Sequence, residues 1–274
     1  MSNLALTIAY DGGEFSGYAR QLGQYTVQGV LEDALAKLSE GGFRTAVAGR
    51  TDRGVHALCQ VVSCAFVVEQ RLDLAKLARS LERMTPQSIS IVSIVAVPAE
   101  FHARFSASWR RYRYLLSTAA FELPHLRRLS WALGPELEIS AMAGAAELLL
   151  GERDFATFCR KDPGGATLVR RVDEVAFVKL GRDLFGFEIE ANAFCHQMVR
   201  AVVGYLVMVG LGERSRADFG VALGARSRRL GVNLAPPEGL FLVGIGYREP
   251  FEGVTVRHSD DFQIVWKSRC TEVG

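Results

Sequence analysis

The sequence of 274 residues has few lysines, no closely paired cysteines and no long apolar run. Its five cysteines include no CxxC pair, which argues against a disulfide framework or a four-thiolate zinc site. The first residues lack the basic segment and apolar core of a signal peptide, and the longest apolar stretch, near 202–211, is too short to span a bilayer. These absences predict a cytoplasmic protein with reduced cysteines and no membrane partner.

Positive charge is present but is carried unevenly. The net charge is only +2, and five of the 32 Lys and Arg residues are lysine, so arginine dominates. The planar guanidinium of arginine binds phosphate through two hydrogen bonds and stacks on bases, which suits a nucleic-acid partner. Biased codon usage gives the same skew, so composition alone leaves both explanations open.

Hydrophobic periodicity predicts a β-α-β-β-α-β order in the first hundred residues. The expected strands cover 4–10, 43–48, 59–68 and 89–97, and the expected helices cover 26–39 and 72–83. This order is the split βαβ arrangement of ferredoxin-like and RNA-recognition folds.

The second half repeats the rhythm less regularly. Strands are expected near 109–117, 172–180, 185–191 and 241–247, and helices near 140–150, 196–209 and 216–225. We therefore predict an α+β protein of two α/β halves, an N-terminal domain over 1–105 and a C-terminal domain over 106–250. The tail, 251–274, shows no period and stays unassigned.

A segment of unusual composition, residues 48–57 (AGRTDRGVHA), lies between two of the predicted strands. Gly49 and Gly54 bracket Asp52 and its arginine neighbours, Arg50 and Arg53. Loops at a sheet end often carry functional residues, and flanking arginines favour the ionised carboxylate, which suits a nucleophile or an electrostatic stabiliser. Taken by itself, however, the pattern is better explained by a turn aspartate that caps backbone amides.

Five blocks of the sequence resemble motifs of one known family, the TruA family of transfer RNA pseudouridine synthases. The blocks are YDGGEFSGYARQ (10–21), GRTDRGVHA (49–57), FHARFSASWRRYRY (101–114), ANAFCHQMVRAVVG (191–204) and APPEGLFLVGIGY (235–247). They follow the family's order and extend over nearly the whole chain. The resemblance implies a pseudouridine synthase fold, in which two ferredoxin-like or RRM-like halves join their sheets around a central RNA-binding cleft.

The same resemblance implies roles for individual residues. Asp52 matches the family's single catalytic residue, and Arg50 is expected to bind substrate beside it. Tyr112 matches the tyrosine that stacks on the flipped uracil and is placed to help with the proton lost from C5. Arg200 matches the basic residue that pairs with the aspartate. Without the resemblance, Tyr112 would be an ordinary strand tyrosine and Arg200 a solvated helix arginine.

Further RNA contacts are expected from a wider set of residues: Arg20, Arg53, Arg104, Arg110 and His56. No second His, Cys or carboxylate lies near His56 at metal-ligand spacing. We therefore interpret His56 as structural or RNA-facing and expect no metal site.

The reaction implied by the resemblance converts uridine to pseudouridine at positions 38–40 of the transfer RNA anticodon stem-loop. It breaks the C1′–N1 bond, turns the uracil and joins C1′ to C5, so it needs no cofactor, and the sequence has no Walker loop or dinucleotide fingerprint. The target base must leave its stack before Asp52 can attack either C6 or C1′. The family also implies a homodimer, so the expected partners are transfer RNA and a second copy of the chain.

Two other functions stay open. Tyr18 and Ala19 stand where the family usually has Trp and Gln, and Arg53 replaces a small residue beside the aspartate. These departures fit a TruA-like paralogue that modifies a different RNA. The other alternative is a catalytically silent RNA-binding protein, although its expected sign, loss of Asp52, Tyr112 or Arg200, is not seen.

Overall fold

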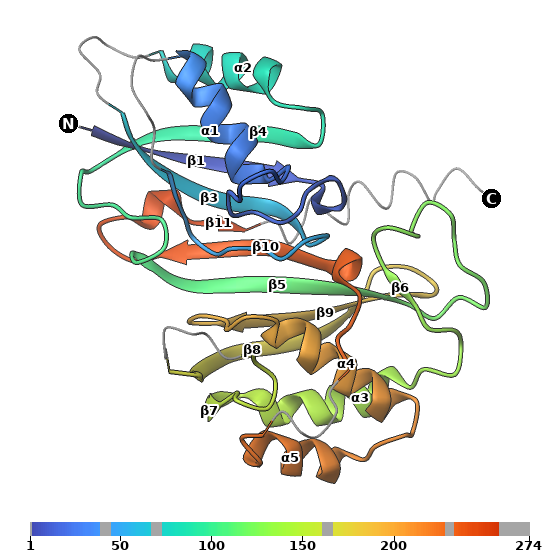
Figure 1. The fold of residues 1–274 in the computed structure, drawn as a ribbon. Helices are drawn as coiled ribbons and strands as arrows, with labels where there is room; N and C mark the ends of the chain where they lie inside the picture. Colours follow the sequence, from blue (N-terminus) through green and yellow to red (C-terminus); the bar gives the residue numbers. More distant parts are fainter. Residues whose placement is uncertain (1, 39–44, 67–72, 161–166, 228–232, 258–274) are drawn as a thin grey trace. The chain divides into compact units, whose positions relative to one another are not determined.

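The computed structural model describes residues 2–38, 45–66, 73–160, 167–227 and 233–257 (Figure 1). The chain forms two compact units. Unit 1 takes its described residues from Met1–Trp109 and Phe241–Ser268, and unit 2 takes them from Arg110–Leu240. Both units mix helices with a sheet, which confirms the predicted α+β class.

Unit 1 begins with the predicted β-α-β-β-α-β order. Its elements are β1 (Ser2–Tyr10), α1 (Val27–Leu38), β2 (Thr45–Val47), β3 (His56–Phe66), α2 (Leu74–Met84) and β4 (Ile89–Val97). The strands lie in the order β4-β1-β3-β2, and each neighbouring pair is antiparallel. This is the sheet order that a split βαβ unit produces.

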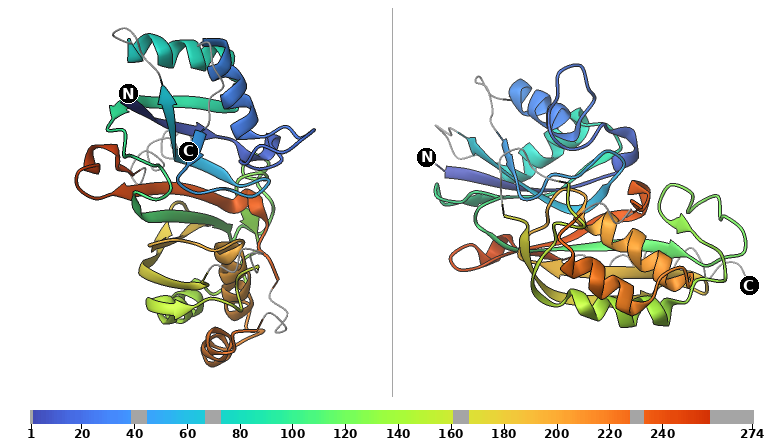
Figure 2. Two further views of the ribbon diagram at one scale, coloured as in Figure 1. Left: turned by 60° about the vertical axis from the view of Figure 1, so that its left-hand side comes forward. Right: turned by 60° about the horizontal axis from the view of Figure 1, so that its bottom comes forward.

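Both helices of unit 1 lie on one face of this sheet, as Figure 2 shows. The buried positions follow a helical period: Val27, Leu31, Ala34 and Leu35 in α1, and Leu77 and Leu81 in α2. Helix α2 is capped at its N-terminus by Asp73, whose carboxylate accepts a hydrogen bond from the backbone N–H of Lys76 at 2.9 Å. The helical period of apolar residues in the sequence therefore matches the residues that are buried in the two helices.

The end of the described chain returns to unit 1. Strand β10 (Leu240–Tyr247) runs parallel to the start of β3, with Phe241 opposite His56, and β11 (Val256–Arg257) pairs with β10. The predicted division assigned 106–250 to the second domain. The structure instead divides the chain after Trp109 and returns it from Phe241 onward, because β10 pairs with β3.

Unit 2 is built on antiparallel strands in the order β5-β9-β8-β7. Its strands are β5 (Ala107–Ser117), which enters the unit at Arg110, β7 (Gly151–Asp154), β8 (Val169–Lys179) and β9 (Leu184–Ala191), and the short β6 (Trp131–Ala132) pairs with β5. Helices α3 (Ile139–Ala146), α4 (Met198–Gly210) and α5 (Arg216–Gly224) lie on one face of these strands (Figure 2).

A disulfide inside unit 2 corrects the expectation that all cysteines are reduced. Cys159 and Cys195, 36 residues apart, are joined. Nearby, the backbone N–H of Arg160 donates to the carbonyl of His196 at 3.0 Å, so the fold itself brings the two segments together. Cys59 and Cys64 are buried free thiols, as predicted, and Cys270 lies outside the described residues.

Candidate active site

Asp52 lies in the loop that connects β2 to β3 in unit 1. Its side chain is half-buried, whereas Arg50 and Arg53 on either side are exposed. The loop closes on itself where the N–H of Val55 donates to the carbonyl of Asp52 at 3.2 Å. Two exposed arginines beside a carboxylate allow RNA to approach it, because their charges attract phosphate groups that the carboxylate would repel. The hydrogen-bonded loop holds the carboxylate in place.

The residue before Asp52 is fixed through both its side chain and its backbone. The hydroxyls of Thr51 and Tyr10 lie 2.7 Å apart in the interior. The carbonyl of Thr51 accepts a hydrogen bond from the N–H of Tyr18 at 3.1 Å. On the other side of the loop, Gln60 Nε2 donates to the carbonyl of Gly49 at 2.7 Å. Three contacts from outside the loop therefore restrict the position of Asp52.

The hydroxyl of Tyr10 is a neutral group in this network. Burial raises its pKa to about 12, against smaller lowering effects of its hydrogen bonds with Thr51 and Gln60. Gln60 Nε2 lies 3.3 Å from this hydroxyl and donates to it, and either hydroxyl of the Tyr10–Thr51 pair can be the donor in their own hydrogen bond. Tyr18, whose ring centroid is 6.3 Å from that of Tyr10, is fully buried, and its hydroxyl has no hydrogen-bond partner among the described residues.

His56 follows the Asp52 loop and is a buried part of the scaffold. It is 2% exposed, and its ring stacks on Phe241 with centroids 4.6 Å apart. Its Nδ1 lies 3.2 Å from the N–H of Gly12 and 3.2 Å from Asp11 Oδ1. The first contact uses the lone pair of Nδ1 and the second uses a proton on it, so only one forms at a time. This position agrees with the structural one of the two interpretations of His56.

Gly12 allows the segment after β1 to lie directly against the loop. A Cβ atom at Gly12 would lie 2.0 Å from the carbonyl oxygen of Val55, so no other residue fits without displacing the backbone there. The turn of Asp11–Gly13 therefore supports the far end of the loop that begins at Gly49.

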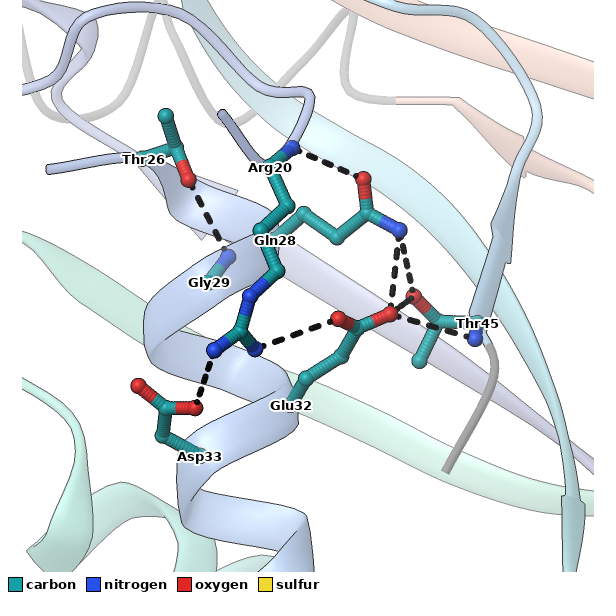
Figure 3. A network of polar contacts seen from close by, with 7 residues as sticks. All are labelled: Arg20, Thr26, Gln28, Gly29, Glu32, Asp33 and Thr45. Carbon is teal, nitrogen blue, oxygen red and sulfur yellow. Dashed lines mark hydrogen bonds and ion pairs between the residues drawn. The ribbon is translucent and has the colours of Figure 1, made fainter. Parts of the chain in front are cut away.

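Arg20, a predicted RNA contact, is held by carboxylates of α1 (Figure 3). Its guanidinium contacts Asp33 Oδ1 at 2.9 Å and Glu32 Oε2 at 3.4 Å, with half of the side chain exposed. Its backbone N–H donates to Gln28 Oε1 at 3.0 Å, and Glu32 Oε1 accepts from the hydroxyl of Thr45 at 2.8 Å. The network ties the 11–26 segment and β2 to α1, and a phosphate would have to compete with two carboxylates for Arg20.

Tyr112 and Arg110 lie two residues apart on β5 in unit 2 and so share one face of the strand. Tyr112 is 8% exposed, and Phe194 meets it edge to face with centroids 5.0 Å apart. The guanidinium of Arg110 donates to the carbonyl of Asn192 at 2.8 Å. The segment around Asn192 and Phe194 thus limits the motion of both side chains.

Arg200 lies in the first turns of α4 and is fixed to the segment that precedes β10. Its Nε donates to the carbonyl of Ala235 at 2.8 Å, and the N–H of Ala235 donates back to the carbonyl of Arg200 at 3.1 Å. The segment can approach α4 because Gly204 has no side chain; a Cβ there would lie 1.9 Å from the carbonyl oxygen of Asn233. Burial raises the pKa of Tyr114, and the charge of Arg200 lowers it by less.

The predicted site residues divide between the two units. Asp52 belongs to unit 1, whereas Tyr112 and Arg200 belong to unit 2, so their convergence in one site stays a prediction. The support of the loop by Tyr10 and Gln60 was not predicted from the sequence. The one available signal for Gln60 was a long polar side chain within a mostly apolar strand.

The described residues contain no group of three or more His, Cys, Asp or Glu side chains that could hold a metal ion. Within the same residues, no helix is both long and apolar enough to cross a membrane.

Comparison with known proteins decides the family. The family model described as tRNA pseudouridine synthase matches residues 6–106 and 145–248. The chain belongs to this family. As a tRNA pseudouridine synthase it is an isomerase, as the motifs predicted.

Several relatives of similar length are named tRNA pseudouridine synthase A. The protein of Frankia casuarinae is 41% identical over 89% of each chain, and that of Roseobacter denitrificans is 38% identical over 92% of this chain and 98% of its own. The protein of Chloroflexus aurantiacus is 39% identical over 90% of this chain and 89% of its own. Among solved structures, a Cbf5-Nop10-Gar1 complex is similar over 89% of this chain and 50% of that chain, with 12% identity and a TM-score of 0.36, too low to support any conclusion.

Proposed function

We propose that this chain converts uridine to pseudouridine at positions 38–40 of the anticodon stem-loop of transfer RNA, with Asp52 as the catalytic carboxylate. The observation that carries the proposal is the half-buried Asp52 in a loop whose neighbour Thr51 is fixed by Tyr10 and Tyr18, in a chain of the tRNA pseudouridine synthase family. Preorganisation of this kind favours catalysis because the reacting group need not be reoriented as charge develops.

The proposed reaction is balanced within the substrate. The target nucleotide flips out of its stack, at a cost of about a few kcal/mol. Asp52 attacks C6 of the uracil or C1′ of the ribose, the C1′–N1 bond breaks, C1′ joins C5, and the bond to Asp52 breaks to free the carboxylate again. The proton on C5 leaves and N1 gains one, so no electron or group is exchanged with a co-reactant. Tyr112 would stack on the flipped base, and Arg200 would pair with Asp52.

The exposed arginines beside Asp52 would supply the attraction for RNA. Arg50 and Arg53 are both exposed, and exposed arginines strengthen binding to the phosphate backbone in a way that added salt weakens. A second copy of the chain is part of the proposal, because one transfer RNA would contact both subunits of a homodimer.

The test is pseudouridine mapping of transfer RNA from a host that lacks this gene. We expect loss of pseudouridine at positions 38–40 and its return with the wild-type gene but not with Asp52→Asn. Asp183→Asn, at an exposed turn before β9, is the matched control and should restore the sites. Full restoration by Asp52→Asn would refute the role of Asp52, and loss of pseudouridine from another RNA only would support the paralogue.

A further inference from the structure

The turn after β4 presents an exposed aromatic ring that the proposed chemistry does not use. Phe105 is 78% exposed, although single exposed apolar residues are common and prove nothing by themselves. What distinguishes Phe105 is its surroundings. The guanidinium carbon of Arg104 lies 5.6 Å from the centroid of its ring, and the ring of His102 lies 4.5 Å away.

The backbone of this turn is held by four hydrogen bonds. The N–H of Ser106 donates to the carbonyl of His102 at 2.9 Å, and the N–H of His102 donates to Ser106 Oγ at 3.1 Å. The Nδ1 of His102 accepts from the N–H groups of Arg104 at 3.2 Å and Phe105 at 3.3 Å. Phe105 is therefore presented by a defined turn.

The base of the turn is fixed to the sheet of unit 1 from two sides. The N–H of Ala103 donates to Ser63 Oγ on β3 at 3.0 Å. The carbonyl of Ala103 accepts from the hydroxyl of Tyr247 on β10 at 2.9 Å. Phe101 is 2% exposed and packs against the ring of Tyr247 with centroids 5.0 Å apart. Phe101 thus anchors the turn to unit 1, whereas Phe105 faces solvent.

We propose that Phe105 is a stacking platform for an unpaired base of the transfer RNA, with Arg104 placed for the adjacent phosphate. This inference rests on the proposed function, since it takes the substrate to be RNA. Single-stranded nucleic acid alternates flat bases with anionic phosphates, and an exposed ring beside a guanidinium matches both parts of that repeat. The polar and charged neighbours of Phe105 do not form the apolar core expected of a protein interface.

The platform lies away from the reacting base. Gly49, where the Asp52 loop begins, contacts Gln60 of β3, and the turn is anchored at Ser63, three residues further along the same strand. At about 3.3 Å per residue this is about 10 Å along the strand. Phe105 is thus a positioning residue that holds RNA beside the reacting uridine and not at it, so its loss should change binding and leave the chemical step unchanged.

The test measures the Kd for an unmodified transfer RNA transcript together with KM and kcat for pseudouridine formation. We expect Phe105→Ala to raise Kd and KM roughly 5- to 150-fold with kcat unchanged. Phe105→Tyr and Phe105→Trp should bind like wild type, whereas Phe105→Leu should bind as weakly as the alanine variant, because it keeps apolar area but loses the π face. The matched control is Phe121→Ala, which removes a ring that is 70% exposed and should change nothing.

A second variant tests the turn itself. His102→Ala removes the acceptor of two backbone N–H groups and should weaken RNA binding, but not further when Phe105 is already alanine, because both changes act through one platform. Wild-type affinity of Phe105→Ala or of Phe105→Leu would overturn the proposal, as would a changed oligomeric state of Phe105→Ala without RNA, which would indicate a protein interface. Failure of the wild type to form pseudouridine would refute the proposed function instead, and RNA affinity would still decide the role of Phe105.

Discussion

The hydroxyls of Tyr10 and Thr51 lie 2.7 Å apart in the interior of unit 1, although the residues are 41 positions apart in the chain. Tyr10 ends β1, and Thr51 immediately precedes Asp52 in the loop. The position of the proposed catalytic carboxylate therefore depends on a contact between the first strand and the loop before β3.

Removal of the Tyr10 hydroxyl should lower both stability and turnover. Tyr10→Phe leaves Thr51 Oγ1 without its buried partner, which costs about 1–3 kcal/mol of the free energy of unfolding. The loop should also become less ordered, so we expect kcat to fall severalfold while the KM for transfer RNA stays unchanged. Denaturant unfolding and steady-state kinetics measure the two effects.

Tyr18→Phe is the matched control for this experiment. The Tyr18 hydroxyl is equally buried but has no hydrogen-bond partner among the described residues, so its removal should leave stability unchanged or raise it. Equal losses in the two variants would show that the Tyr10–Thr51 contact contributes nothing specific.

Substitution of Gly12 should disturb the same loop from its other end. The Cβ of Gly12→Ala would lie 2.0 Å from the carbonyl oxygen of Val55, so the backbone must move, and we expect a loss of about 1–3 kcal/mol in the free energy of unfolding with reduced kcat. Gly144→Ala is the control, because a Cβ inside α3 at that position meets nothing within 4 Å. It should stabilise the helix by about 0.5–1 kcal/mol. Thermal unfolding of the two variants should shift in opposite directions.

The buried pair of Arg113 and Glu188 in unit 2 should be costly to break. Arg113 Nε donates to Glu188 Oε1 at 2.8 Å, and both residues are under 9% exposed. Arg113→Leu leaves a buried carboxylate short of a partner, so we expect a loss of about 3–5 kcal/mol in the free energy of unfolding.

An exposed pair provides the comparison for that result. Arg171 contacts Asp173 at 2.7 Å with about half of its side chain exposed, and Arg171→Ala should cost under about 1 kcal/mol. Chemical denaturation of both variants tests the contrast; similar losses would mean that burial does not set the strength of the Arg113 pair.

The free thiols should resist alkylation in the folded protein and affect stability at alkaline pH. Burial raises the pKa of both Cys59 and Cys64 from 9.0 to about 12, and the thiolate is the reactive form. Unfolding lowers the pKa again, so the unfolded chain binds fewer protons above pH 9. The free energy of unfolding should therefore be unaffected by these thiols below about pH 9, where they are protonated in both states, and should fall as the pH rises towards 12.

Alkylation at pH 8 followed by peptide mapping checks this expectation. Peptides of Cys59 and Cys64 should be labelled only after denaturation, and Cys159 and Cys195 only after denaturation and reduction. Rapid labelling of Cys59 in the native protein would contradict its burial.

Local patterns in the sequence were sufficient for most helices and strands. The helical periods of α1 and α2 and the alternation of the long strands of unit 1 depend on neighbouring residues, which the sequence displays directly. The short strands β6, β7 and β11 were missed because runs of two to four residues do not establish a period, whereas the equally short β2 lies within the predicted strand 43–48.

Long-range pairings were beyond the sequence. That β10 joins unit 1 depends on its pairing with β3, and that Cys159 meets Cys195 depends on the fold around α4. The candidate site shows the same division. Asp52 was predicted from its motif, whereas the support of its loop by Tyr10 and Gln60 consists of contacts between segments that no local pattern connects.

The pairing of β10 with β3 also bears on how the protein is made. His56, next to the Asp52 loop, lies opposite Phe241, a residue that leaves the ribosome only after all of unit 2 has been synthesised. Unit 1 therefore cannot complete its sheet during synthesis of its own first 109 residues, and unit 2 is the part that can fold while the chain is still growing. A nascent chain released before residue 241 would carry every predicted site residue and still lack the strand against which His56 packs.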